Sequence, residues 1–375
     1  MIRLFSIDLD PKRTFGLDVL RALAILFVVI GHGIGLIPKE LRKFVEFFVF
    51  DGVSIFFVLS GFLIGGILIK LVEEKGLNFS VLRNFWVRRW FRTLPNYFLV
   101  LLVLCILNFF FKDGFNLWSV NRYFFFSQNL FTAHPSWFFP EAWSLSVEEW
   151  FYLMLPLLLV FFTFLIKKPA KSTLLLVCFT VISGITIFRL YRYLHIPLKD
   201  IVDWDLIFRK QVITRLDSLM FGVIGAYINY YFHATWIKYK RLFLILGVVL
   251  FFLSNYVFPI YFSLTGAFSC VLSFSVISLA TLFLLPYLSE LKSGKGVFYK
   301  AITYISITSY SVYLIHLSIV QSWIIYKLPW VAYTGNSYLV SLSNCAIYYV
   351  LTMALSILLY KYFEVPMTRI RERIR

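Results

Sequence analysis

Ten long apolar stretches dominate this 375-residue sequence. A helix needs about 20 apolar residues to cross the hydrocarbon core of a bilayer, and stretches of about that length recur along the whole chain. Hydrophobic residues make up 60% of the sequence and charged residues 15%, whereas soluble proteins have about 45–50% and about 25%. The composition excludes a soluble enzyme, a disordered protein and a fibrous protein. The unbroken runs also disfavour a β-barrel, whose strands alternate polar and apolar residues.

We therefore expect an all-α fold, a polytopic transmembrane helical bundle of about ten spans. The predicted spans are 15–37, 47–69, 94–111, 147–166, 173–191, 212–232, 242–258, 264–288, 301–326 and 337–361. The connections are short, and no Gly-, Ser- or Pro-rich linker separates domains. Residues 1–375 are expected to form a single integral-membrane domain with no appended soluble domain. The N-terminus lacks the early apolar core of a signal peptide.

The basic residues predict the orientation of the bundle. If the N-terminus is inside, the cytoplasmic segments hold most of the Lys and Arg residues, as is typical of membrane proteins. We expect both termini in the cytoplasm and the protein in the bacterial cytoplasmic (inner) membrane, surrounded by lipid. The net charge is +17, but no basic arm stands apart from the spans, so no nucleic-acid partner is expected. The cysteines show no metal-binding or redox spacing, and no metal is expected.

The first span contains three ionisable residues, Asp18, Arg21 and His32. Such residues within spans are costly and usually mark function. Arg21 and His32 share one helix face, about 16 Å apart along the axis, and Asp18 can pair with Arg21. The functional interpretation is a polar seam that leads into a buried site. In the alternative, Asp18 and Arg21 reach the inner boundary and His32 bonds a neighbouring carbonyl.

A second polar group opens the fourth span, where Ser144 and Glu148 are i,i+4 neighbours on one helix face. A carboxylate at this depth can orient an imidazole and stabilise its protonated form. Alternatively, Ser144 is a helix N-cap within a capping box. Trp143, in the same stretch, is interpreted as an aromatic residue of the interfacial belt.

A third group, Arg88, Arg89 and Arg92, lies at the inner mouth of the third span. Guanidinium groups bind phosphate bidentately, but basic residues at this position also act as ordinary cytoplasmic anchors. Arg215 and His316 are further polar groups within predicted spans, and each taken singly has a structural interpretation. Ser60-Gly61 suits a close approach of two helices.

Several of these motifs together resemble membrane-bound acyltransferase family 3. Leu17-Asp18-Val19-Leu20-Arg21-Ala22-Leu23-Ala24 followed by His32 is similar to the family signature of an arginine, ten residues and a histidine. Further similar segments follow in order over essentially the whole chain: 56–64, the Arg89–Arg92 pair, 143–152, 215–218, 310–316 and 362–366. Two residues depart from the family pattern. Ser54 stands where many relatives have an acid, and Ser318 stands where a proline often follows the last histidine, which favours a packing role for His316.

The resemblance implies O-acylation, usually O-acetylation, of a carbohydrate hydroxyl with acetyl-CoA as donor co-substrate. The acceptor would be lipopolysaccharide, capsule, exopolysaccharide or a precursor of these. In this interpretation His32 is the general base, Glu148 with Ser144 orients its imidazole or the acceptor, and the thioester arm passes Arg21. The arginines Arg88, Arg89 and Arg92 bind the donor phosphates. Trp143 could stack on a sugar ring, although the interfacial belt is favoured slightly. Supporting or substrate-contacting roles fall to Asp18, Ser144, Trp143, Arg215 and His316. The sequence leaves open whether transfer is direct or passes through an acyl-histidine.

Two other classes of function remain open from the sequence. In a transporter or flippase of a glycan or small molecule, the buried ionisable residues would line a proton or substrate path. A sensor or scaffold would use them without catalysis. Acceptor-dependent release of CoA thiol separates an enzyme from a transporter.

Overall fold

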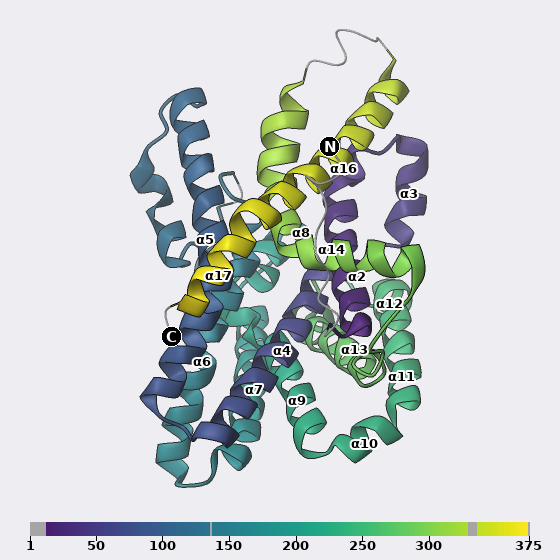
Figure 1. The fold of residues 1–375 in the computed structure, drawn as a ribbon. Coiled ribbons are helices and arrows are strands. Elements are labelled where there is room, and N and C mark those ends of the chain that lie inside the picture. The colour runs from purple at the N-terminus through teal and green to yellow at the C-terminus, as the bar shows by residue number, and fades with distance from the viewer. Residues whose placement is uncertain (1–12, 136, 329–335, 374–375) are drawn as a thin grey trace.

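The computed structural model describes residues 13–135, 137–328 and 336–373 (Figure 1). These residues form helices and no β-strand. Nine of their segments are long and apolar enough to cross a bilayer: Phe15–Leu36, Lys39–Lys75, Phe79–Phe111, Ala142–Ile166, Ala170–His195, Lys240–Tyr261, Phe268–Leu288, Gly296–Lys327 and Ser337–Ile370. The predicted all-α membrane bundle is confirmed.

The bundle is built from ten long helices joined by shorter helical segments. The long helices are α2 (Phe15–Gly33), α4 (Gly52–Lys75), α5 (Phe79–Phe111), α6 (Ala142–Ile166), α7 (Ala170–His195), α9 (Leu216–Tyr231), α11 (Lys240–Phe252), α13 (Ser273–Leu288), α14 (Gly296–Ile315) and α16 (Ser337–Leu359). The shorter α-helices are α3 (Lys39–Phe47), α8 (Ile201–Trp204), α10 (His233–Lys238), α12 (Phe258–Tyr261) and α17 (Val365–Arg373). The 3₁₀ and π segments are η1 (Ile34–Leu36), η2 (Leu117–Phe125), η3 (Asp205–Arg209), η4 (Val212–Thr214), η5 (Leu253–Val257), η6 (Phe268–Leu272), η7 (His316–Ile324), η8 (Ile325–Lys327) and η9 (Tyr360–Glu364).

The sixth predicted span, 212–232, corresponds to η4 and α9 and is not among the nine segments long enough to cross a bilayer. Helix α9 has 16 residues, fewer than the about 20 that a full crossing needs. It packs against α4, α7 and α13, and most of its side chains are buried. The structure therefore has nine full-length segments and one shorter helix enclosed by them.

Helix α5 begins 15 residues before the predicted span. The side chain of Asn78 accepts a hydrogen bond from the backbone N–H of Val81 at 3.0 Å and caps the helix. The 33-residue helix is about 50 Å long, longer than the bilayer core, and its polar first turns lie outside the apolar stretch. Arg89 and Arg92 are consequently held by a rigid helix instead of a loop.

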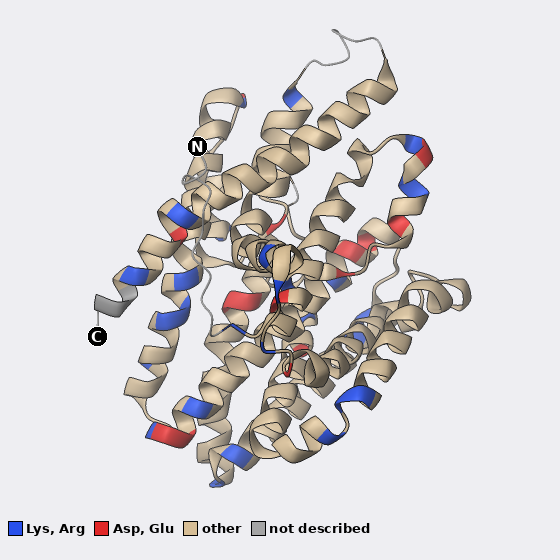
Figure 2. Cartoon of the chain, turned by 45° about the vertical axis from the view of Figure 1, so that its right-hand side comes forward, with Lys and Arg blue, Asp and Glu red and all other residues tan. Residues whose placement is uncertain are grey.

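Charged side chains lie mostly at the ends of the helices, with a further group in the centre of the bundle (Figure 2). The long tan stretches of ribbon between them are the apolar spans. The central group is unusual for a membrane protein, because ionisable residues at this depth are costly unless they are paired or line a cavity.

Helices α4 and α9 approach so closely that only glycine fits at their contact. A Cβ atom on Gly61 would lie 1.9 Å from the carbonyl oxygen of Leu219, and one on Gly222 would lie 2.0 Å from that of Val58. The predicted close approach at Ser60-Gly61 is confirmed. This contact fixes the helix that carries Ser60 against the helix that begins after Arg215.

Gly61→Ala is expected to destabilise the protein by about 1–3 kcal/mol, because the new methyl group forces α4 and α9 apart. The midpoint of thermal unfolding in detergent measures the effect. Gly66→Ala is the matched control in the same helix, since a Cβ atom there meets nothing within 4 Å. Equal midpoints for the two variants would contradict the close-packing explanation.

Candidate active site

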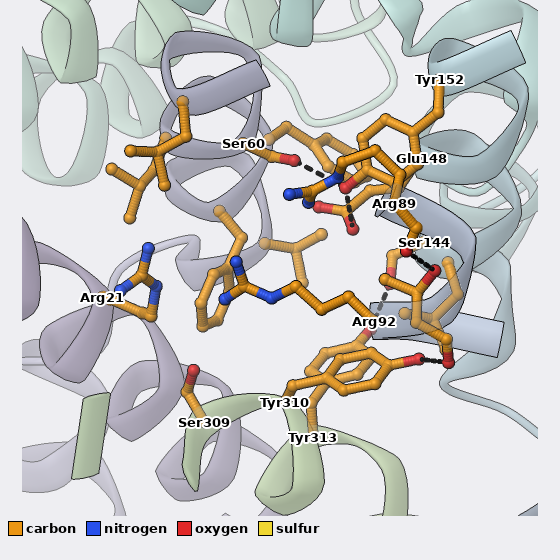
Figure 3. Close-up of a pocket in the computed structure, with 17 residues that line it drawn as sticks. Arg21, Ser60, Arg89, Arg92, Ser144, Glu148, Tyr152, Ser309, Tyr310 and Tyr313 are labelled. Atoms are coloured by element: carbon orange, nitrogen blue, oxygen red, sulfur yellow. Dashed lines mark hydrogen bonds between the residues drawn. The ribbon is translucent and has the colours of Figure 1, made fainter. Parts of the chain in front are cut away.

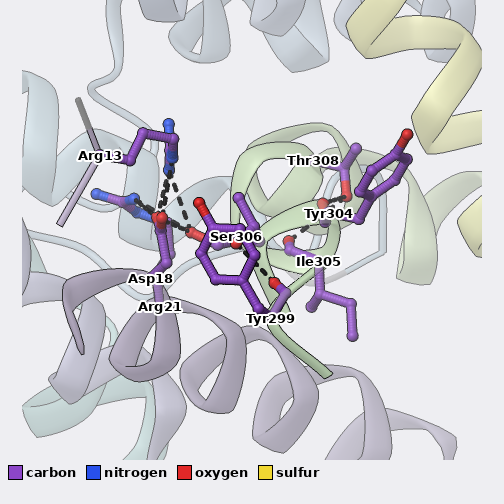
Figure 4. Close-up of polar contacts among 9 residues, drawn as sticks. Arg13, Asp18, Arg21, Tyr299, Tyr304, Ile305, Ser306 and Thr308 are labelled. Carbon is purple, nitrogen blue, oxygen red and sulfur yellow. Dashed lines mark hydrogen bonds and ion pairs between the residues drawn. The ribbon is translucent and has the colours of Figure 1, made fainter. Parts of the chain in front are cut away.

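A buried carboxylate organises the start of α2 (Figure 4). Asp18 is 2% exposed and accepts hydrogen bonds from Arg13 Nε at 2.9 Å, Arg21 Nη1 at 3.3 Å and Ser306 Oγ at 2.6 Å. Arg13 Nη2 also donates to Asp18 Oδ1. The Asp18–Arg21 pair agrees with the prediction from their spacing, whereas Arg13 and Ser306 come from segments that the sequence did not connect to them. Asp18 thus holds two guanidinium groups in place.

These guanidinium groups face a cavity of about 360 Å³, which we call the outer cavity. Its described lining residues are Arg13, Arg21, Arg92, Ser306, Ile307, Ser309, Tyr310, Tyr360, Glu364, Val365, Thr368 and Arg369. Residues near the two described ends of the chain, Arg13 and Arg369, therefore line the same cavity. Neither Arg92 nor Arg369 forms a hydrogen bond or salt bridge with another described residue. Unpaired guanidinium groups that line one cavity attract an anion.

A narrower cavity of about 110 Å³, the inner cavity, continues from the outer one (Figure 3). Arg21, Arg92, Ser309 and Tyr310 line both cavities. The other described lining residues of the inner cavity are Val53, Phe56, Phe57, Leu59, Ser60, Leu63, Arg89, Thr93, Ser144, Leu145, Glu148, Tyr152 and Tyr313. The two cavities adjoin at these four shared residues, and we call them together the channel. The outer cavity is its wide, cationic end, and the inner cavity is its narrower, more apolar end.

Glu148 is the carboxylate of the inner cavity, and its hydrogen-bond partner is a tyrosine. The hydroxyl of Tyr152 donates to Glu148 Oε2 at 3.0 Å and lies 2.9 Å from Ser60 Oγ. The guanidinium of Arg89 lies over the ring of Tyr152, 5.0 Å from its centroid. In Figure 3 Arg89 and Glu148 face the space toward which Arg21 and Arg92 also point. The predicted contact between Glu148 and the imidazole of His32 is absent among the described residues, because His32 pairs with another side chain.

That partner is His316, a second histidine 284 positions further along the chain. His316 Nδ1 lies 2.8 Å from the carbonyl oxygen of Tyr313 and 3.2 Å from that of Val312. A carbonyl oxygen only accepts hydrogen bonds, so Nδ1 carries a proton and Nε2 of the neutral ring presents a lone pair. This Nε2 lies 2.8 Å from Nδ1 of His32, which must therefore donate. The remaining nitrogen, Nε2 of His32, is left unprotonated, as a general base requires.

The local fold explains why a backbone carbonyl is available to His316. Helix α14 ends at Ile315, and the chain continues from His316 in the wider π form. A change from i→i+4 to i→i+5 bonding leaves a carbonyl without its usual N–H partner, and such π segments are frequent at functional sites. His316 is fully buried, whereas His32 is exposed. The buried ring can therefore orient the accessible one.

The described cavities do not extend to the far end of the predicted seam from Arg21 to His32. His32 does not belong to the described lining of either cavity. Tyr313 lines the inner cavity, and its ring centroid lies 5.7 Å from that of His316. The Tyr313 hydroxyl is 2.6 Å from Ser144 Oγ and donates to the carbonyl oxygen of Glu141 at 3.2 Å. Ring contacts therefore connect the inner cavity through Tyr313 and His316 to His32.

Three other predicted site residues lie outside the cavities. Arg88 is exposed and lines neither described cavity, so α5 contributes two of the three predicted arginines. Trp143 is 4% exposed and packs edge-on against Phe57, so the interpretation as an interfacial belt residue is wrong. Arg215 is fully buried, with Nη2 donating to Ser54 Oγ at 2.6 Å.

The capping interpretation of Ser144 is also wrong. Helix α6 begins at Ala142 after Glu141, and no side chain caps it. Ser144 lies within the first turn, where its hydroxyl is free to bond Tyr313.

The family comparison agrees with this geometry. The acyltransferase domain of acyltransferase family 3 matches residues 14–361, which include α2, the inner cavity and the histidine pair. Five lining residues of the outer cavity lie outside this range: Arg13, Glu364, Val365, Thr368 and Arg369. The chain belongs to this family. Its members are acyltransferases by description, and the match covers nearly all of the sequence. No solved structure matches the chain.

Two curated relatives of the family carry more specific names. Peptidoglycan O-acetyltransferase OatA of Listeria monocytogenes is 32% identical over 189 residues, which are 47% of this chain and 29% of that protein. O-acetyltransferase OatA of Staphylococcus aureus is 30% identical over 234 residues, 58% of this chain and 35% of that protein. The chain spans about a third of the length of the curated relatives it matches.

The two departures from the family pattern both have a structural explanation. Ser54 Oγ donates to Asp51 Oδ2 at 2.6 Å while accepting from Arg215, so a carboxylate one turn earlier in the chain lies beside position 54. Ser318 donates its backbone N–H to Glu141 Oε1 at 3.1 Å and its hydroxyl to Oε2 at 2.5 Å. A proline there could not donate the first of these bonds. The Ser318–Glu141 contact fixes η7 two residues after His316.

No group of three or more His, Cys, Asp or Glu side chains within the described part of the chain is placed to hold a metal ion. The functional groups that the structure does bring together are guanidinium, carboxylate, phenol and imidazole.

Proposed function

We propose that this protein moves an acetyl group from acetyl-CoA to a hydroxyl of a cell-surface carbohydrate across the bacterial cytoplasmic membrane. The observation that carries the proposal is the arginine-lined channel, which connects through the rings of Tyr313 and His316 to His32 and its unprotonated Nε2. The names of the family and of its OatA relatives support the acyl chemistry. Both termini, and with them the wide end of the channel, face the cytoplasm in this proposal, where acetyl-CoA is made.

The donor would lie along the channel with its phosphates at the wide end. Arg21, Arg89 and Arg92 bind the diphosphate, which they match in charge and geometry. The pantetheine arm extends into the narrower, more apolar inner cavity. Its amide groups can bond to Glu148, so the proposed role of this carboxylate is to hold the donor. The thioester then reaches Tyr313, and Ser144 fixes the position of that ring through its hydroxyl.

The acceptor would approach from the His32 side. His32 Nε2 takes the proton of the sugar hydroxyl as its oxygen attacks the thioester carbonyl carbon. The carbon–sulfur bond breaks, the new ester bond forms, and the imidazolium returns its proton to the leaving thiolate to give free CoA. Tyr313 must move aside for the two substrates to meet. His316 holds the hydrogen bond that keeps Nδ1–H of His32 pointing away from the acceptor.

Acceptor-dependent thiol release tests this function. The purified full chain in detergent is mixed with acetyl-CoA and with soluble fragments of envelope glycan, and free thiol and glycan-bound acetyl are measured. We expect both to rise together only when glycan is present. A transporter would release no thiol, and a protein that binds CoA without glycan-dependent release would contradict the proposal.

Replacing His316 with either of two amides tests its pairing with His32. The amide of glutamine can occupy the place of Nε2 and accept from His32, whereas the shorter asparagine reaches only the place of Nδ1. We expect His316→Gln to keep turnover within about tenfold of the wild type and His316→Asn to lower it by about 10²-fold or more. The dissociation constant for CoA is expected to stay unchanged in both. Equal turnover in the two variants would mean that His316 only packs.

A further inference from the structure

The outer cavity holds more positive charge than the inner one, and the additional arginines come from the two ends of the chain. Arg21 and Arg92 line both cavities, whereas Arg13 and Arg369 line only the outer one. This sharing gives an order along the channel. Arg89 and Glu148 lie furthest inward, Arg21 and Arg92 lie in the middle, and the terminal arginines lie furthest outward.

The carboxylates of the outer cavity do not neutralise all of this charge. Asp18 is occupied by Arg13, Arg21 and Ser306. Glu364 is buried and accepts through one oxygen from Asn96 at 2.9 Å and Ser311 at 2.7 Å. Arg369, like Arg92, forms no hydrogen bond or salt bridge with the described residues. The outermost part of the channel therefore retains a guanidinium group that is free to bind an anion.

The position of Arg369 is set by the helix that carries it. Glu364 is tied to α5 through Asn96 and to α14 through Ser311, and α17 begins at the next residue. Val365, Thr368 and Arg369 all line the cavity, as one face of a helix requires for residues at i, i+3 and i+4. The Thr368 hydroxyl donates to the Glu364 carbonyl at 2.9 Å and so bonds within its own helix. Among the residues of α17 whose side chains the structure describes, Arg369 is the charged one that lines the cavity.

We propose that Arg369, together with Arg13, binds the phosphate monoester at the nucleotide end of the donor, the 3′-phosphate of CoA. The inference rests on the proposed function. If the thioester lies in the inner cavity and the diphosphate lies at Arg21, Arg89 and Arg92, the 3′-phosphate is the next anionic group outward. Arg369 would make the protein select CoA thioesters over acyl carriers that lack this phosphate.

A membrane lipid phosphate has the same chemistry, but the structure favours the donor. Arg369 shares its cavity with Arg21 and Arg92, and this cavity continues into the channel that leads toward the histidine pair. Binding of a lipid headgroup at Arg369 would not explain why its cavity continues into the inner cavity. It would also not make the affinity for a soluble nucleotide depend on Arg369.

The affinities for CoA and for 3′-dephospho-CoA test the proposal without any acceptor. Calorimetry on the full chain in detergent is expected to show tighter binding of CoA by about tenfold or more in the wild type, as one charged hydrogen-bonded contact supplies. Arg369→Gln is expected to weaken CoA binding by about tenfold and to leave dephospho-CoA unchanged. Arg369→Lys keeps the positive charge but loses the bidentate geometry of the guanidinium group. Its affinity for CoA is expected to lie between those of the wild type and of Arg369→Gln. The matched control is Lys300→Gln, which removes an exposed charge that lines neither described cavity.

Equal weakening of both ligands by Arg369→Gln, or no effect on either, would overturn the assignment of Arg369 while leaving the proposed donor intact. Binding of neither ligand by the wild type would overturn the assignment and the proposed donor together. The two failures are therefore distinguishable.

Discussion

His32→Ala is expected to lower acetyl transfer by about 10²- to 10⁴-fold, the usual contribution of a general base. The substitution removes the unprotonated Nε2 that the His316 pair leaves available. His32 is exposed and lies in the last turn of α2, so its loss should disturb packing little. The rate is measured as transfer of labelled acetyl from acetyl-CoA to envelope glycan, and the dissociation constant for CoA is measured in parallel. We expect the second quantity to be unchanged.

His195→Ala provides the matched control for this variant. His195 is also exposed and lies at the end of a helix, where its Nδ1 bonds the carbonyl oxygen of Tyr191 at 2.8 Å. It belongs to neither described cavity lining. Wild-type rates are expected. Full transfer activity in His32→Ala would exclude His32 as the base, however well the channel binds CoA.

The double substitution Arg89→Gln with Arg92→Gln is expected to weaken CoA binding by about 10²-fold or more. A hydrogen bond to a charged group contributes about 1.5–3 kcal/mol, and two guanidinium groups are lost. Nε of Arg89 is buried without a hydrogen-bond partner, and Arg92 has no salt-bridge partner among the described residues. Both side chains are therefore placed for a ligand. The KM for acetyl-CoA should rise much more than the KM for the acceptor.

Arg88→Gln distinguishes the role that the structure predicts for Arg88 from the role that the sequence pattern predicted. The sequence assigned all three arginines to the donor phosphates, whereas the structure directs Arg88 away from both cavities. We expect a near-normal KM for acetyl-CoA in this variant. A donor KM that stays unchanged in the Arg89 and Arg92 double variant would make these residues ordinary cytoplasmic anchors.

Features that depend on local sequence were predictable. Hydropathy found the membrane spans because burial in lipid requires long apolar runs. The Asp18–Arg21 pair followed from its i,i+3 spacing. The early start of α5 was not predictable, because its first turns are polar and hydropathy detects only the part of a helix that lies within the bilayer core.

Contacts between distant segments were not predictable from one sequence. The His32–His316 pair joins residues 284 positions apart, and no local pattern reveals which span lies beside α2. His316 was predicted to support the site, with Ser318 favouring a packing role, and neither interpretation indicated that its ring contacts His32. The convergence of Arg13 and Arg369 likewise depends on the packing of both chain ends against α5 and α14.

Sidedness of the reaction tests the central claim most directly. The protein is reconstituted into liposomes and populations are selected in which the arginine-lined end faces outward, with a soluble glycan fragment enclosed inside. Labelled acetyl-CoA, which does not cross the bilayer, is then added outside. The account predicts labelled ester on the enclosed glycan and free CoA thiol in the outer solution, both lost in His32→Ala. Acetylation only when glycan and acetyl-CoA share the same side would contradict a channel that brings the two substrates together from opposite faces of the membrane.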